Sequence, residues 1–429
     1  MLNREELVAG LEALLAEAKR PAEPPKPTRI LVPSGGDVQA VLNGTDVPII
    51  ELEAGGRYAS VVIARPVRLE CRGATLHGEG VPAIYVPPGE SSHDIDIIEP
   101  VASSTFQVPI RLGDNGPSQA RLADVPRRIR IVAPVILNHN HAAAKNGIEN
   151  NAAEVEITQP TIRDVYSPGR VESHGIVTIN TPGGLKVMGG TVSGASTPLF
   201  TGGDAIELPD TDIADVWYDD IDITRPADWQ GVLDGNFKNL VEFKNVTRGR
   251  VTRCRIYNNW GPIQKGFACM LTPKVDGRIV DVEFNDNDIY NVGGGFNVLG
   301  RNPTGQDPTR TDDIRITNNR VIIDKNAYGP GSFGWFLLLS AGPGRILAEG
   351  NNVKHNGNAF IYVDDRERIA SLIVRGNTFN AGAYGIKTPF GNNGDNWREV
   401  FDELVVTGNR VSGASAVFKR NFPDNEWIS

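Results

Sequence analysis

The chain has 429 residues, with 43 Lys and Arg against 52 Asp and Glu, and so carries a net charge of −9. An acidic body of this kind repels nucleic acid, and the basic run 127-RRIR-130 is too short to form a binding stripe, so we expect no nucleic-acid partner. No stretch of 18 apolar residues occurs, which excludes a membrane-spanning helix.

Cysteine and histidine indicate neither a disulfide framework nor a metal site. Cys71, Cys254 and Cys269 lack CxxC spacing, and we expect Cys254 and Cys269 to be apolar fillers inside strands. His139 and His141 would share one face of an extended 138-NHNH-141. We interpret this segment as a solvated corner, and we predict no metal site and no cofactor.

The first 20 residues predict an amphipathic helix that anchors or oligomerises the chain. Asn3 and Glu6 fit a capping box at the start of a helix over residues 3–19. Its apolar seam consists of Leu7, Leu11, Leu14 and Ala18. The segment lacks the basic start and continuous apolar core of a signal peptide. A Pro-rich linker over residues 21–30 follows, and it holds the helix away from the rest of the chain.

Farther along, the chain repeats a short pattern of two apolar residues, a Gly or Asn corner, and then Asn-x-Val/Ile/Phe. The Asn recurs in steps of 32, 32, 26 and 32 residues, at Asn287, Asn319, Asn351, Asn377 and Asn409. Periods of about 20–50 residues mark repeat architectures. The apolar runs are short and rich in Val, Ile, Phe and Thr, so each period predicts strands and not helices.

Each period also holds a second apolar run, such as 266-GFACML-271 or 416-AVF-418, which we interpret as another strand. Such a coil buries its side chains only against the coils above and below it, so we expect a column of stacked parallel sheets. An Asn at the same corner of successive coils would stack on itself and satisfy the backbone groups of the bend. Asn also tolerates the left-handed conformation that a sharp corner needs, so we interpret the five residues as a structural ladder.

These repeats resemble the right-handed parallel β-helix proteins of the pectate-lyase-like superfamily. The opening 33-PSGGDVQAVLNGTDVPIIELEAGGRY-58 and the segment 291-NVGGGFNVLGRN-302 add to the resemblance, which spans about residues 30–420. It implies an all-β, right-handed parallel β-helix of about ten to twelve coils over residues 49–418. It also implies an N-terminal cap over residues 31–48, with a short helix from Asp37 to Gly44, and a C-terminal tail or cap over residues 419–429.

The superfamily includes pectin and alginate lyases, polygalacturonases and phage tailspikes, so the fold alone does not select an activity. The fragments 173-SHG-175 and 385-GIK-387 do not complete a polygalacturonase signature, and no lyase motif is present. Calcium is therefore expected only if the chain is a lyase.

Binding residues usually lie on loops that project from a rigid column. We expect longer excursions at residues 101–127, 194–203, 225–239, 301–312, 324–334 and 389–400. Acidic residues near strand ends give four weak catalytic candidates: Asp204, Glu207, Asp364 and Asp365. Counting from the corner anchors aligns Phe360 with Ile386, which predicts a groove near Asp364 and Asp365. Its carbohydrate-binding candidates are Arg301, Trp335, Tyr362 and Lys387, and the alternative is a salt-bridged surface with no ligand.

Three functions remain open on this basis. The first is a virion-associated, tailspike-like protein that binds, and in one version cleaves, a cell-surface polysaccharide. It would act on the virion or outside the cell after lysis, as a homotrimer, with residues 1–20 docked on another virion protein. The second is a bacterial polysaccharide lyase or glycoside hydrolase that lacks its signal peptide. The third is a non-catalytic structural or adhesive column.

Overall fold

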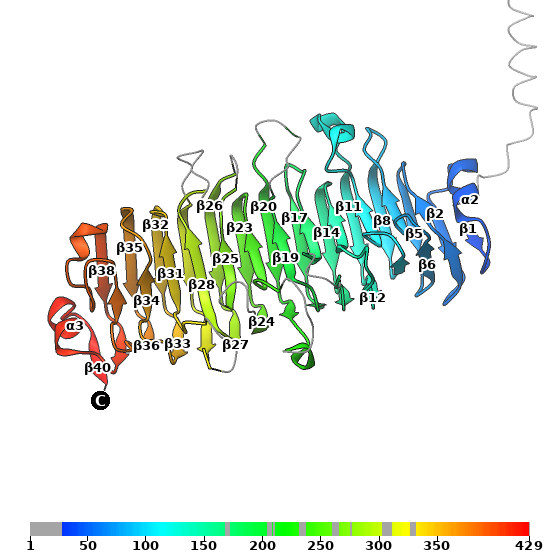
Figure 1. The fold of residues 1–429 in the computed structure, drawn as a ribbon. Coiled ribbons are helices and arrows are strands. Elements are labelled where there is room, and N and C mark those ends of the chain that lie inside the picture. The colour runs from blue at the N-terminus through cyan, green and yellow to red at the C-terminus, as the bar shows by residue number, and fades with distance from the viewer. Residues whose placement is uncertain are drawn as a thin grey trace, which may run out of the picture.

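The computed structural model describes residues 28–167, 172–203, 208, 211–230, 237–259, 266–274, 277–302, 311–326 and 332–428. The predicted helix over residues 1–20 lies outside this range, as do most of the 21–30 linker and the candidates Asp204 and Glu207. In the described part, three parallel sheets run the length of an elongated column (Figure 1). The predicted all-β parallel β-helix is therefore confirmed.

The first and second sheets each contain 14 strands within the described residues. The first sheet consists of β1 (Arg29–Val32), β2 (Ile49–Leu52), β5 (Val67–Glu70), β8 (His93–Ile98), β11 (Arg127–Val132), β14 (Ala153–Thr158), β17 (Leu185–Met188), β20 (Ala214–Asp219), β23 (Val246–Thr252), β26 (Ile279–Asn285), β29 (Asp312–Thr317), β32 (Arg345–Glu349), β35 (Ile369–Arg375) and β38 (Phe401–Thr407). The second sheet consists of β3 (Arg57–Ala59), β6 (Thr75–Gly78), β9 (Val101–Ser104), β12 (Val135–Leu137), β15 (Thr161–Arg163), β18 (Thr191–Ser193), β21 (Asp222–Thr224), β24 (Arg255–Asn259), β27 (Asp288–Val292), β30 (Arg320–Ile323), β33 (Asn352–His355), β36 (Thr378–Asn380), β39 (Arg410–Ser412) and β40 (Glu426–Ile428).

The third sheet contains 12 strands within the described residues, one from each coil that contributes to all three sheets. They are β4 (Val61–Val62), β7 (Ile84–Val86), β10 (Ile110–Leu112), β13 (Asn146–Asn150), β16 (His174–Thr178), β19 (Thr197–Thr201), β22 (Val241–Phe243), β25 (Phe267–Leu271), β28 (Gly294–Leu299), β31 (Leu337–Ser340), β34 (Ile361–Val363) and β37 (Ile386–Lys387). The excursions predicted at residues 101–127 and 194–203 were too long, because they include β9, β10 and β19.

Short helices lie at the two ends of the column and in its loops. At the N-terminal end (blue in Figure 1), α2 (Val38–Gly44) begins where the Asp37 carboxylate accepts a hydrogen bond from the Ala40 N–H at 2.9 Å, as the sequence predicts. The 3₁₀ helices are η1 (Pro117–Gln119), η2 (Leu122–Asp124), η3 (Ala227–Trp229) and η4 (Trp397–Glu399). The first sheet begins ahead of the predicted Ile49, because β1 pairs with β2. No helix among the described residues is long and apolar enough to span a membrane.

The interior of the column is filled by side chains that stack from coil to coil. Along most strands buried residues alternate with more exposed ones, which is the period of two that a strand imposes. One run of packed aromatic rings has centroids 3.8 to 6.1 Å apart and consists of Tyr218, Phe243, Phe284, Phe296, Phe336, Phe360 and Phe379. Burying one such side chain contributes about 1.5–3 kcal/mol, so packing between neighbouring coils holds the column together.

The three cysteines are fully buried in this core. Burial raises the pKa of each thiol, which keeps the sulfur atoms protonated and unreactive. Cys254 and Cys269 are therefore the apolar fillers that their sequence context predicts.

The corner between the first and second sheets repeats one backbone conformation. Its first residue is left-handed, with φ of 58° at Asp286, 56° at Asn318 and 67° at Gly350. The ladder Asn that follows each of these residues, at 287, 319 and 351, has no positive φ. The prediction that the ladder residues themselves adopt the left-handed conformation was therefore wrong. The residue before each Asn turns the chain, and the Asn contributes its side chain.

The side chains of these asparagines are joined by hydrogen bonds from coil to coil. The backbone N–H and Nδ2 of Asn319 donate to Oδ1 of Asn351 at 2.9 and 3.0 Å, and Asn351 donates to Oδ1 of Asn377 at 2.8 and 2.9 Å. Nδ2 of Asn351 also donates to the carbonyl of Ile316 at 2.8 Å. Asn287 and Asn409 take part in the same way, and all five are buried. We call this the amide stack.

The C-terminal tail extends the column. Asn409 donates from its backbone N–H and Nδ2 to Oδ1 of Asn425 at 2.9 and 2.7 Å, and β40 pairs in parallel with β39. The strand predicted at residues 416–418 was wrong. Ser415 instead accepts a hydrogen bond from the Phe418 N–H at 3.1 Å and starts the helix α3 (Ala416–Asn421), which lies at the red end of Figure 1.

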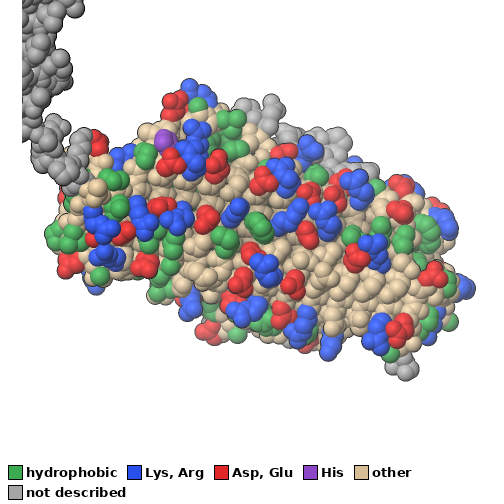
Figure 2. All heavy atoms as spheres, turned by 180° about the vertical axis from the view of Figure 1, so that it is seen from behind, with side chains coloured by type: hydrophobic (Ala, Val, Ile, Leu, Met, Phe, Trp, Pro, Cys, Tyr) green, Lys and Arg blue, Asp and Glu red, His purple; other side chains and the backbone are tan. Residues whose placement is uncertain are grey.

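Outward-facing Arg side chains pair with carboxylates on neighbouring coils. Examples are Arg248 with Asp215 at 2.7 Å and Arg375 with Glu349 at 2.6 Å. Figure 2 shows the result as Lys and Arg side chains interleaved with Asp and Glu along the column. An exposed pair contributes about 0–1 kcal/mol, so these pairs neutralise the surface more than they stabilise the fold.

Candidate functional site on the third sheet

One outward-facing residue from each strand of the third sheet lies in a continuous row along the column. The strand register places them side by side in the order Val62, Tyr85, Arg111, Glu149, Val177, Phe200, Glu242, Met270, Asn297, Leu338, Tyr362 and Lys387. We call this set the outer row. Neighbouring strands lie about 4.8 Å apart, so the row extends over roughly 50 Å.

The middle of the outer row is buried although it faces away from the core. Glu149 is 7% exposed and Glu242 is 2% exposed. Glu149 accepts hydrogen bonds from Nε of Arg111 at 3.2 Å and from Nδ2 of Asn146 at 3.1 Å. Glu242 accepts from Nδ2 of Asn239 at 3.1 Å. A buried carboxylate needs such partners because its desolvation is costly, so this face holds its charges by specific contacts.

A group of three charged or titratable side chains lies beside these carboxylates. Nζ of Lys238 donates to Oε2 of Glu172 at 2.8 Å, and Oε1 of Glu172 lies 3.5 Å from Nε2 of His174. Burial alone would raise the pKa of Glu172, but His174 and Lys238 outweigh it and lower that pKa to about 2. Glu172 is therefore an anion at all ordinary pH values.

The His174 ring is held by two contacts. Its Nδ1 donates to Oδ1 of Asn146 at 2.9 Å, and its ring centroid lies 4.5 Å from that of Phe200. These contacts leave Nε2 as the ring atom that can gain or release a proton. Nε2 of His174 and Oε1 of Glu172 are shielded from solvent and make no hydrogen bond within the described residues. The arrangement provides a proton carrier, a fixed anion and a cation on one face.

The comparisons with known proteins agree with the fold. No protein-family model matches the chain, and no curated protein matches its sequence. Among solved structures, the A-module of the Azotobacter vinelandii mannuronan C-5 epimerase AlgE4 is similar, with a TM-score of 0.51 and 12% identity over 87% of this chain and 97% of that one. The chain therefore has the parallel β-helix fold.

Two further β-helices are also similar. A PL6 family alginate lyase has a TM-score of 0.49 and 13% identity, over 94% of this chain and 53% of that chain. A tailspike protein of Escherichia coli bacteriophage HK620, solved with a pentasaccharide, has a TM-score of 0.44 and 11% identity, over 89% of this chain and 64% of that chain.

Three of the four predicted carbohydrate-binding residues contact one another in this β-helix. Tyr362 and Lys387 belong to the outer row, and Trp335 stacks on Tyr362 with ring centroids 4.0 Å apart. Nζ of Lys387 lies 5.2 Å from the centre of the Tyr362 ring. Trp335 is only 5% exposed, so its ring is packed against protein and not presented to solvent. The cluster closes one end of the outer row.

The remaining predicted residues lie near this end. Arg301 forms an ion pair with Glu367, and the Asp365 carboxylate accepts hydrogen bonds from the N–H groups of Ala341 and Glu367, so it holds a turn together. Asp364 is exposed. The pKa of Tyr362 is raised first by burial of its own ring and then by the negative charge of Asp364.

The alignment used to predict this groove was wrong by one residue. The structure pairs Ile361, and not Phe360, with Ile386. A slip of one residue exchanges the two faces of a strand. The correct register is the one that turns both Tyr362 and Lys387 outward.

The buried polar residues of the outer row were not predicted from the sequence, and His174 was assigned to the chance fragment 173-SHG-175. A signal was present, because Glu149 in 147-GIEN-150 and Glu242 in 241-VEF-243 are single carboxylates inside short apolar runs. Such a charge must face outward from a strand whose neighbours are buried. The described residues contain no group of three or more His, Cys, Asp or Glu side chains arranged to hold a metal ion.

Proposed function

We propose that the chain binds a polysaccharide lengthwise along the outer row and cleaves it beside His174. The observation that carries this proposal is the half-buried group of Glu172, His174 and Lys238, which lies beside an outer row that follows the column over roughly 50 Å. A linear polymer that follows the column can contact the half-exposed members of this row, among them Tyr85, Arg111, Asn297, Tyr362 and Lys387. A carboxylate with a shifted pKa, such as Glu172, is a common feature of catalytic sites.

In this proposal each charged group has one task. His174 moves a proton at Nε2, while Asn146 fixes the ring through Nδ1. His174 and Lys238 keep Glu172 ionised, so Glu172 provides a fixed negative charge beside the ring. The reaction is either an elimination, which is the reaction of a polysaccharide lyase, or a hydrolysis, which is the reaction of a glycoside hydrolase. Calcium stays an expectation tied to the lyase version. Location in a virion, docking through residues 1–20 and a homotrimer stay proposals that rest on the sequence alone.

Replacing His174 tests the catalytic part. We expect His174→Gln to lower the rate of polysaccharide cleavage by at least about 100-fold, because general acid–base catalysis contributes about 10²–10⁴ in rate. The assay measures unsaturated products from polygalacturonate and alginate, and reducing ends from neutral glycans. His77→Gln is the matched control, because His77 is exposed on the second sheet. Equal rates for His174→Gln and the unmodified chain would exclude His174 as the proton carrier.

The same measurements separate cleavage from binding. If the unmodified chain cleaves none of these polymers but is retarded by one of them in affinity electrophoresis, it is a binding protein and the catalytic part of the proposal is wrong. If it neither cleaves nor binds any of them, the structural or adhesive alternative holds.

A further inference from the structure

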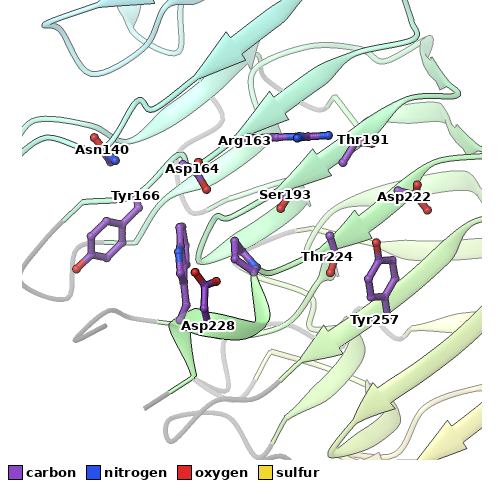
Figure 3. Close-up of a pocket in the computed structure, with 12 residues that line it drawn as sticks. Asn140, Arg163, Asp164, Tyr166, Thr191, Ser193, Asp222, Thr224, Asp228 and Tyr257 are labelled. Carbon is purple, nitrogen blue, oxygen red and sulfur yellow. The ribbon is translucent and has the colours of Figure 1, made fainter. Parts of the chain in front are cut away.

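The second sheet carries a groove of about 730 Å³ on its outward face, away from the outer row (Figure 3). The groove lies over β15, β18, β21 and β24, and its floor is made by Thr191, Ser193 and Thr224. These side chains are small, whereas larger ones stand at either end, so the sheet is hollow at this point. Four adjacent strands span roughly 14 Å, enough for a short saccharide chain.

Aromatic rings form both ends of the groove. By strand register Tyr257 lies between Thr224 and Tyr290, and its ring stacks on Tyr290 at 4.8 Å, so its other face looks over Thr224 into the groove. At the other end Trp229, on η3, packs against Tyr166 with centroids 5.6 Å apart. Aromatic faces at the ends of a polar hollow are typical of saccharide sites, because the apolar face of a sugar stacks on them.

The charged groups of the groove make few contacts within the protein. One lining carboxylate, Asp222, pairs with Arg255, and farther along the sheet Arg320 pairs with Asp288. Arg163 makes no ion pair and no side-chain hydrogen bond among the described residues. The carboxylates of Asp164 and Asp228, which lie in the same groove, make none either. Burial raises the pKa of Asp164, while the positive charge of Arg163 lowers it and the negative charge of Asp228 raises it further. The carboxylates of Asp164 and Asp228 are therefore close enough to interact.

We infer that this groove is a second saccharide-binding site, separate from the outer row. Sugar rings stack on Tyr257 and Trp229, and their hydroxyl groups bond to the free donors and acceptors of Arg163, Asp164 and Asp228. This inference does not rest on cleavage at His174, since the two sets of residues lie on different sheets. The role of the groove is to hold a polymer on the column at a point away from the outer row.

The test measures binding of hexasaccharides to the full chain by isothermal titration calorimetry. The probes are cello-, xylo-, chito-, polygalacturonate- and alginate-derived hexasaccharides, titrated to millimolar concentration. For the hexasaccharide that binds best, we expect Arg163→Gln and Tyr257→Ser each to lower the affinity about tenfold or more, the effect of losing one charged hydrogen bond or one stacking face. Arg320→Gln and His77→Gln are the two controls, because both residues lie on the second sheet outside the groove, and His174→Gln is measured beside them.

The outcomes are distinct. Loss of binding in both groove variants but not in the two controls supports the inference. Unchanged binding in Arg163→Gln and Tyr257→Ser overturns it, and so does the absence of binding by every probe. Loss of binding in His174→Gln with unchanged binding in the groove variants assigns the saccharide to the outer row alone.

Discussion

At the scale of single residues, burial changes the behaviour of groups that the sequence presents as ordinary. His139 was expected at a solvated corner, but it is only 3% exposed. Its Nε2 donates to the carbonyl of Gln107 at 3.1 Å, and the His141 ring lies 4.7 Å away. Burial, more than any other cause, lowers the pKa of His139 to about 4. His139 is therefore neutral in the folded protein under conditions where the unfolded chain would protonate it.

This difference predicts a loss of stability in weak acid. The unfolded pKa of His is about 6.5, so the contribution is complete above about pH 6.5 and is lost as the pH falls toward 4. When the pH falls from about 7.5 to about 5, the protonation of His139 on unfolding lowers the free energy of unfolding by about 2 kcal/mol. Urea unfolding measures this change in the free energy of unfolding between the two pH values, and the change should be smaller for His139→Gln than for the unmodified chain. His77→Gln should leave the difference unchanged, and equal differences in all three proteins would contradict the assignment.

At the scale of the coil, the amide stack joins each corner to the next. Asn351 accepts two hydrogen bonds from Asn319 and donates to both Ile316 and Asn377. Asn351→Ala leaves buried donors and acceptors unpaired at about 1–3 kcal/mol each, so we expect a loss of roughly 2–5 kcal/mol in the free energy of unfolding. The neighbouring Asn352→Ala is the control, because Asn352 is exposed. Chemical denaturation compares the two, and similar midpoints would show that the stack contributes little.

The repeat pattern predicted the coils because each coil meets the same physical demand. A corner residue, an Asn and an apolar anchor recur in sequence because they recur in space. Where the pattern changed, prediction failed. The last winding follows the one before it after only 16 residues, with Asn425 stacked on Asn409 and Trp427 paired with Val411 as its anchor. This winding was not predicted. The strand predicted at residues 416–418 failed because Ser415 provides a helix cap that apolar content does not reveal.

The candidate site was harder to predict than the fold. Residues that face each other across coils, such as Glu172 and Lys238, are 66 positions apart and belong to loops whose lengths vary. Periodicity fixes which strand pairs with which, but it does not fix how loops turn polar groups over a sheet. Tyr362 and Lys387 lie side by side on strands, although the register used to predict this was wrong by one residue. Arg301 pairs with Glu367, as the alternative of a salt-bridged surface predicts.

At the scale of the whole molecule, the column has stability that is local to each coil. Each coil contacts mainly the coils next to it, so the free energy is close to a sum of coil and interface contributions. The ends therefore need covering, since an open strand edge would fray or pair with another chain. At the C-terminal end Phe418 is fully buried, packs over Gly385 and lies 5.0 Å from the Phe422 ring.

Removing the Phe418 side chain should loosen only the C-terminal coils. A buried Phe→Ala change costs about 3–5 kcal/mol, and in a solenoid that cost falls on the nearest interfaces. Hydrogen exchange of Phe418→Ala should show lost protection in β37, β38 and β39 and unchanged protection in β8 and β11, since these strands are separated from the change by many intact coils. Lys419→Ala is the control, because Lys419 is exposed on the same helix. A uniform loss of protection along the column would mean that the coils unfold as one unit.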